Sequence, residues 1–286
     1  MDTEIYYFSG TGNSLFVARE LQKRIPDSKL VPIVNLLDKP RIKAEGKAIG
    51  IVFPCYALTL PVAVKRFVKK LDVQSADYIF TAVTRLGTVF RGLKTLDRLL
   101  AQKKKKLDAH FVVNMCNNEG PRSEIAYEVP TKARIQQVES AVIAYLDNIS
   151  PIIRKREAFR GKDDSYTISC SPNPVKNLLI EKLVVFGMNL SEYVGGVNYF
   201  YHDEKCNGCG ICEKVCLSGK IRVAGRQAVW QKNTFCYMCY ACLNFCPQQS
   251  VQVGSIPGVA SHTAENGRYP HPYATVKDIA SQKSGS

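Results

Sequence analysis

Long apolar runs are missing from this chain of 286 residues. The best candidate for a membrane span, residues 177–190, is interrupted by Glu181 and Lys182, so we expect no transmembrane helix. The start of the sequence, Met1-Asp2-Thr3-Glu4, has neither the basic nor the apolar region of a secretory signal. We therefore expect a cytoplasmic protein whose thiols stay reduced.

The sequence also shows no pattern of a histidine metal site and none of a nucleic-acid interface. None of the 4 histidines stands in ligand spacing with another. Basic residues outnumber acidic ones, 39 to 25, but they are dispersed. The densest run, residues 103–106, is typical of the solvated end of a helix, where lysines are favourable. The sequence therefore predicts no nucleic-acid binding, despite a formal charge of +14.

The cysteines of this chain form a regular pattern: of the 11 cysteines, most fall into two copies of C-x2-C-x2-C-x3-C. The first copy is Cys206, Cys209, Cys212 and Cys216. The second is Cys236, Cys239, Cys242 and Cys246. In two-cluster bacterial ferredoxins such runs ligate two [4Fe–4S] clusters, and the fourth cysteine of each run ligates the other cluster. We therefore expect one cluster on Cys206, Cys209, Cys212 and Cys246, and the other on Cys236, Cys239, Cys242 and Cys216.

Structural zinc is the alternative interpretation of these cysteines. Zinc sites use C-x2-C pairs, four sulfurs to a metal, and do not need the third evenly spaced cysteine of each run. Pro247 follows the second run, whereas Leu217 stands at the equivalent place after the first. That difference leaves the turn after Cys216 and the potential of the second cluster open.

Strand-like and helix-like segments alternate through the first half of the chain. The expected strands are residues 5–8, 30–34, 48–53, 78–83 and 109–115, and helical spacing occurs over residues 14–24, 61–71 and 91–100. This alternation predicts an α/β doubly wound, five-stranded parallel sheet with helices on both faces. Ligands of such a fold lie at the carboxyl ends of the strands.

The loop after the first strand leads directly into a helix and reads SGTGNS over residues 9–14. A helix N-terminus with hydroxyls beside it can hold a phosphate. No Gly-Lys-Ser/Thr follows and no G-x-G-x-x-G is present, so neither the nucleoside-triphosphate loop nor the dinucleotide fingerprint is expected.

Residues 7–14, with the sequence YFSGTGNS, resemble the FMN phosphate loop of flavodoxins. Residues 53–56, FPCY, resemble their second flavin loop, and residues 84–87, TRLG, lie where the third would be. A flavodoxin-like domain followed by two ferredoxin runs is similar to the flavodoxin–ferredoxin fusion family of bacteria and archaea. The resemblance covers about residues 3–250.

This resemblance implies an FMN whose phosphate binds Ser9, Thr11, Gly12, Asn13 and Ser14. It also implies flavin-ring contacts from Pro54, Tyr56, Thr84, Arg85 and Gly87. Tyr56 would stack on the ring or remain an ordinary half-buried aromatic. Arg85 would stabilise reduced flavin if it lies at the N1/C2 edge, or would be a solvated charge on the rim.

The expected domains are a flavodoxin-like domain over residues 1–150, a linker and inter-domain helix over 151–200, a small α+β ferredoxin-like domain over 201–254 and a tail over 255–286. Within this region, residues 154–171 are expected to be a linker or surface loop, and residues 174–193 a helix that either packs between the domains or covers the edge of the sheet. The last six residues are expected to be disordered. Cys55, Cys116 and Cys170 lie outside the cysteine runs. A buried apolar role is expected for them, and the alternative for Cys55 and Cys116, which follow the third and fifth strands, is a redox-active thiol near the flavin.

Together these features predict an electron-transfer protein that relays electrons between two [4Fe–4S] clusters and FMN. With the cofactors bound, the net charge would fall to roughly +8. A basic surface favours an acidic redox partner protein or a small-molecule anionic acceptor. The alternative is an FMN-dependent reductase of a small organic substrate, fed through the clusters. A third interpretation is an interaction module stabilised by zinc.

Overall fold

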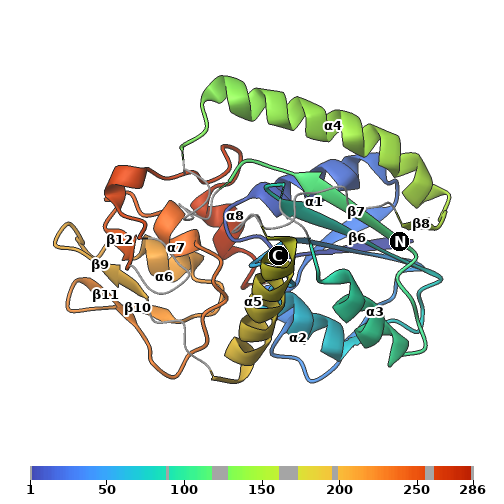
Figure 1. Ribbon diagram of the computed structural model, residues 1–286, viewed down its shortest axis with the longest axis horizontal. Coiled ribbons are helices and arrows are strands. Elements are labelled where there is room, and N and C mark those ends of the chain that lie inside the picture. The colour runs from blue at the N-terminus through green and yellow to red at the C-terminus, as the bar shows by residue number, and fades with distance from the viewer. Residues whose placement is uncertain are drawn as a thin grey trace.

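The computed structural model describes residues 2–87, 90–117, 128–160, 173–194, 199–254 and 261–284. Its centre is a six-stranded sheet in the order β2-β1-β4-β6-β7-β8, with every neighbouring pair parallel (Figure 1). The strands are β1 (Thr3–Tyr7), β2 (Ser28–Pro32), β4 (Ala48–Pro54), β6 (Tyr78–Arg85), β7 (Ala109–Asn114) and β8 (Phe159–Arg160). Two short strands, β3 (Ile42–Lys43) and β5 (Leu71–Asp72), pair beside it.

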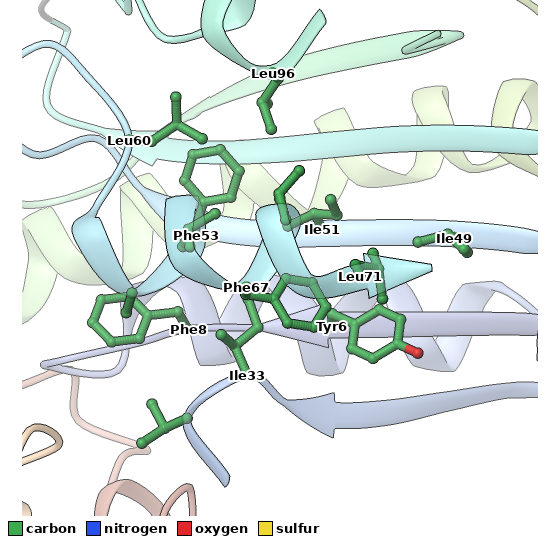
Figure 2. Packing of buried hydrophobic residues seen from close by; sticks show 14 of the residues in the cluster. Tyr6, Phe8, Ile33, Ile49, Ile51, Phe53, Leu60, Phe67, Leu71 and Leu96 are labelled. Carbon is green, nitrogen blue, oxygen red and sulfur yellow. The ribbon is translucent and has the colours of Figure 1, made fainter. Parts of the chain in front are cut away.

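Helices cover both faces of the sheet. On one face lie α1 (Asn13–Arg24) and α4 (Lys132–Arg154), and on the other lie α2 (Val62–Lys70) and α3 (Leu93–Ala101). A 3-10 turn, η1 (Val34–Leu36), follows β2. The central strands β4 and β6 are buried along almost their whole length, as strands covered on both faces must be. Figure 2 shows aromatic rings from β1, β4 and α2 meeting branched aliphatic side chains in the core on the α2 face.

The five long strands stand in the order 2-1-3-4-5, which is the doubly wound order of flavodoxin-type sheets. The expectation of a parallel α/β sheet is thus confirmed. The bounds differ from the expectation in several places: β1 spans Thr3–Tyr7 rather than residues 5–8, and β6 continues to Arg85 rather than ending at residue 83. The second strand begins at Ser28 rather than at residue 30, and β8 adds a sixth strand that sequence periodicity did not indicate because it is only 2 residues long. Since α4 continues to Arg154 and β8 pairs with β7, the sheet unit extends to residue 160 rather than ending at 150.

The cysteine module, residues 199–254, repeats its backbone with an offset of thirty residues. It contains β9 (Phe200–His202), α6 (Ile211–Val215), β10 (Ile221–Ala224), β11 (Gln227–Trp230), α7 (Ala241–Asn244) and β12 (Val251–Val253). Strand β9 pairs with β12, and β10 with β11, both antiparallel. Positive φ angles recur at equivalent positions of the two halves: Gly208 and Met238, Gly210 and Tyr240, Gly219 and Gln249. Non-glycine residues take this strained conformation in the second half, so both cysteine runs are held in one backbone shape.

Helix α5 (Pro174–Val194) differs from the expectation that it packs between the domains. It is held by an ion pair in which Arg91 donates to the buried Glu181, at 2.7 and 2.9 Å. Six of its described apolar side chains are exposed, whereas Ile180, Val184 and Val185 are half-buried; the exposed ones are those of Val175, Leu178, Leu179, Leu183, Phe186 and Leu190. The apolar content of residues 174–194 did not indicate whether another surface of the protein would cover these side chains. In the described ranges, no helix combines the length and apolarity that crossing a membrane requires.

The tail after the module folds back over the sheet unit. It forms η2 (Ala264–Asn266) and α8 (Val276–Ala280), and α8 contacts α6 (Figure 1). The expectation of disorder over the last six residues is wrong for residues 281–284, because Gln282 is fully buried. Polar composition was misleading here, because the polar side chain of Gln282 hydrogen-bonds to backbone groups inside the protein instead of to solvent. Cys170 and most of the expected surface loop lie outside the described residues.

Candidate functional site

The first thiol set comprises Cys206, Cys209, Cys212 and Cys246, which the sequence assigns to one cluster. All four line a single pocket together with Gly208 and Gly210. Burial raises the pKa of the Cys212 thiol to about 12, and the thiols of Cys246, Cys206 and Cys209 add to that rise. The backbone N–H of Ser250 donates to the Cys246 Sγ at 3.3 Å. The fourth cysteine of the second run therefore lies with the first three of the first run.

The second thiol set comprises Cys236, Cys239, Cys242 and Cys216. The pKa of Cys236 is raised to about 11 and that of Cys239 to about 12, mainly by burial, and the neighbouring Cys216 thiol contributes to both rises. Burial also raises the pKa of Cys242 well above its usual value, and the neighbouring thiols of Cys216, Cys239 and Cys236 raise it by smaller amounts. The backbone N–H of Met238 donates to the Cys236 Sγ at 3.4 Å. The crossed grouping expected from the sequence is thus the grouping that the structure has.

The donor arrangement bears on which metal these thiols fit. Among the described residues, no three His, Cys, Asp or Glu side chains converge as ligands of one metal ion. A tetrahedral zinc site requires four donors around one ion. In a four-iron cluster each thiolate binds a different iron, so its sulfurs surround the cluster without converging on one point. The four thiols grouped in each set, with backbone N–H groups directed at the Sγ atoms of Cys236 and Cys246, are donors that suit an iron–sulfur cluster, and zinc stays the alternative interpretation.

A buried ammonium lies beside the second thiol set. Lys220 is 0% exposed, and its Nζ donates to the carbonyl oxygens of Gln231 and Thr234, each at 2.8 Å. Its charge lowers the pKa of the Cys236 thiol, against the larger effect of burial. Two neutral carbonyls do not neutralise a buried charge, and an unneutralised ammonium is costly to bury. Thiolates or an anionic cluster at the second thiol set would supply the missing negative charge.

The second thiol set packs directly on the loop of residues 9–14, the phosphate loop. A Cβ added to Gly10 would lie 2.2 Å from the carbonyl oxygen of Cys239 and 2.7 Å from its Cβ. The ring of Tyr237 meets that of Phe8 edge-on, with centroids 6.1 Å apart, and the Arg66 guanidinium lies 4.8 Å above the Phe235 ring. The predicted cluster ligands and the predicted flavin loop therefore meet backbone against backbone.

The phosphate loop itself has the features that an anion site needs. Helix α1 begins after Gly12, which has φ +109° and makes no side-chain cap, so its first N–H groups have no partner within the helix. Ser9 and Ser14 are each 1% exposed. The Ser14 hydroxyl shares a 2.7 Å hydrogen bond with that of Thr84, which joins the first loop to the third. The Oδ1 atom of Asn13 is buried without a hydrogen-bond partner among the described residues. This uncapped, hydroxyl-lined helix start fits a phosphate.

Two residues of the tail fix this loop, and the sequence did not reveal either. The Gln282 side chain accepts from the Ser9 N–H at 3.0 Å and donates to the Ser9 carbonyl at 2.8 Å. His271 donates its backbone N–H to the Thr11 carbonyl at 2.8 Å, and a Cβ on Gly12 would lie 2.6 Å from the Cβ of His271. Because these contacts join residues more than 250 positions apart, no local pattern indicates them.

The second and third loops lie at the carboxyl ends of β4 and β6, as expected. Pro54 ends β4, and the half-buried Tyr56 ring meets Phe8 edge-on at 6.2 Å. Arg85 Nε and the Gly87 N–H both donate to the Asn114 Oδ1, at 3.1 and 3.3 Å. Asn114 ends β7 and was not singled out in the sequence, although its place at a strand end could have indicated it.

The two described cysteines outside the runs lie near these loops. Cys116 is buried, its carbonyl accepts from the Asn13 side chain at 2.9 Å, and burial raises the pKa of its thiol. Cys55 is half-buried, and its N–H donates to the Thr84 carbonyl at 2.8 Å. The main chain of Cys55 therefore joins the second predicted loop to the third, and the carbonyl of Cys116 holds the Asn13 side chain of the first.

No family model and no curated protein matches the chain. Among solved structures, a putative flavoprotein from Bacteroides uniformis is 18% identical and covers 40% of this chain and 90% of its own, with a TM-score of 0.32. An azoreductase from Bacillus anthracis is 10% identical and covers 54% and 100%, with a TM-score of 0.35. A flavodoxin from the domain Archaea is 13% identical and covers 52% and 99%, with a TM-score of 0.30. At TM-scores this low none of these likenesses carries an argument about this chain, whose fold is established by its strand order.

Proposed function

We propose that this chain is an electron-transfer protein that holds two [4Fe–4S] clusters and one FMN and passes electrons between them. When bound, the clusters exchange single electrons and the flavin exchanges one or two, so the protein would couple one-electron to two-electron carriers. The two thiol sets would ligate the clusters. Residues 9–14 would hold the flavin phosphate, and the loops at Tyr56 and Thr84 would border its ring.

The observation that carries this proposal is the contact between Cys239 and Gly10. Electron transfer slows steeply with distance, so a relay requires its centres to lie close together. Here a ligand of the second thiol set touches the loop that would bind the phosphate, with no side chain between the two backbones. The 0% exposed Lys220 supports negative charge at the same thiol set.

The chain's own residues would prepare both sites. Backbone N–H groups directed at the Sγ atoms of Cys236 and Cys246 would stabilise thiolate ligands. The positive end of α1 would attract the phosphate dianion, and the hydroxyls of Ser9 and Ser14 would orient it. The packing of Phe8, Tyr56 and Tyr237 would exclude water between the second thiol set and the loop.

The test is anoxic purification followed by analysis of iron, zinc and flavin. We expect one flavin to about eight irons, as two four-iron clusters require. Stepwise reduction, followed by visible and EPR spectra, should show electrons redistributing between clusters and flavin. Two zinc ions per chain, or chromophores that do not exchange electrons, would end the proposal.

Two cysteine variants give a matched comparison. Cys242→Ser removes a ligand of the second thiol set and should lose the EPR signal of one cluster, with about four irons remaining. Cys116→Ser changes a buried thiol outside both sets and should keep about eight irons. Equal iron loss in both variants would mean that the runs do not ligate clusters.

A further inference from the structure

The two thiol sets repeat in sequence but differ in their surroundings. The sheet unit covers the second set through Gly10 against Cys239, and through Phe8 against Tyr237. Among the described residues, those that line the pocket of the first set all belong to the cysteine module, and Cys209 of this set is exposed. Packing on the sheet unit therefore leaves no thiol of the second set exposed, whereas the first set has an exposed thiol in Cys209.

We propose that the surface around Cys209 is the docking site through which electrons enter or leave, and that its partner is a small acidic one-electron carrier protein. This inference rests on the proposed function. A partner docked at the first thiol set would exchange one electron with the cluster there, so that one of the two is oxidised as the other is reduced, without bond formation or proton transfer. The second thiol set would then connect that cluster to the phosphate loop.

Charge favours an acidic partner. The chain has a formal charge of +14, which would remain roughly +8 with cofactors bound. Two exposed cations flank the exposed thiol. Lys205 immediately precedes Cys206, and the backbone of Arg226 lies 2.5–2.8 Å from a Cβ built on Gly208, next to Cys209. Of the acids nearby, Glu213 is paired with Arg222, whereas Asp203, which accepts from Gln252 and the Lys205 N–H, and the exposed Glu204 keep opposing charges, so the attraction for an acidic partner comes from the excess positive charge of the whole chain.

The experiment uses the full chain with its cofactors and an acidic two-[4Fe–4S] ferredoxin as the probe. Anoxic stopped-flow measures the second-order rate constant of electron exchange in the favourable direction, from the change in cluster absorbance. We expect Lys205→Glu with Arg226→Glu to lower this rate constant about tenfold at low salt, with the difference vanishing at high salt. Each single variant should give part of the loss.

Lys29→Glu is the matched control, because Lys29 is exposed at the amino end of the edge strand β2, the end of the sheet away from the ligand loops. It makes the same change in net charge as each single variant, Lys205→Glu or Arg226→Glu, and should leave the rate constant within about twofold. Reduction by the methyl viologen radical cation, which needs no acidic docking surface, should not slow in the double variant.

Iron and flavin analysis of each protein separates the two proposals. With about eight irons and one flavin present, an unchanged rate in the double variant, or an equal loss in Lys29→Glu, overturns the docking site and leaves the proposed function standing. Protein that contains no iron refutes the proposed function before any rate is measured.

Discussion

Gln282 makes the contact whose loss can be predicted most fully. Its amide is 0% exposed and pairs with both the N–H and the carbonyl of Ser9. Gln282→Ala would leave two buried backbone groups without partners, at about 1–3 kcal/mol each. The side-chain entropy recovered offsets about 1.5–2 kcal/mol. We therefore expect the free energy of unfolding to fall by about 2 kcal/mol.

Hydrogen exchange at the phosphate loop measures this effect locally. If the amide of Ser9 exchanges through opening of this contact, a loss of about 2 kcal/mol corresponds to roughly thirtyfold faster exchange. Gln282→Met, which fills similar volume without hydrogen bonds, should behave like Gln282→Ala. The control is Gln136→Ala, because Gln136 is exposed on α4. Unchanged exchange at Ser9 in both Gln282 variants would refute the reasoning.

Three more perturbations test other contacts. Gly10→Ala should separate the cysteine module from the phosphate loop, because its Cβ would lie 2.2 Å from the Cys239 oxygen; flavin–cluster electron exchange should slow, whereas Gly187→Ala, with nothing within 4 Å, should leave it unchanged. Lys220→Met should lower the midpoint potential of one cluster by roughly 50–100 mV in an EPR-monitored titration, because a buried positive charge beside Cys236 stabilises the reduced, more negative cluster. Burial lowers the pKa of His271 from 6.5 to about 4, so between these values the unfolded chain binds more protons and stability falls with falling pH. In Glu139→Gln, where the neighbouring carboxyl cannot titrate, His271 should contribute about 3 kcal/mol to the fall in the free energy of unfolding from pH 7 to pH 4, and His271→Gln added to that variant should make the fall smaller by this amount.

The cysteine spacing and the strand alternation predicted the thiol sets and the sheet because both patterns are local. The grouping of Cys216 with Cys236, and of Cys246 with Cys206, followed from knowledge of how such runs fold, and the structure has it. The expected positions of the strand ends likewise predicted that Thr84 and Ser14 lie at the same edge of the sheet, where their hydroxyls share a hydrogen bond. Each of these depends on a motif or period visible within about thirty residues of sequence.

What the sequence did not reveal depends on contacts between distant residues. Gln282 stands in a polar tail and gives no sign that it pairs with Ser9. Asn114 looks like an ordinary strand end until Arg85 and Gly87 are seen to share its side-chain oxygen. The short strand β8 has too few residues for a period, and the apolar pattern of α5 predicts a buried face that the described structure leaves exposed.

The difference between Leu217 and Pro247 shows why the repeat is not symmetric in space. Pro247 is exposed, whereas Leu217 is 3% exposed and belongs, with Val215 and Ala241, to the same hydrophobic cluster as Phe8. The residue after the fourth cysteine therefore ends a surface turn in the second half of the module, whereas in the first half it packs the module against the sheet unit. Because one core spans both units, the second thiol set cannot move away from the phosphate loop without exposing apolar surface, at about 25 cal/mol per Å². The separation between these two sites is therefore set by core packing rather than by a linker.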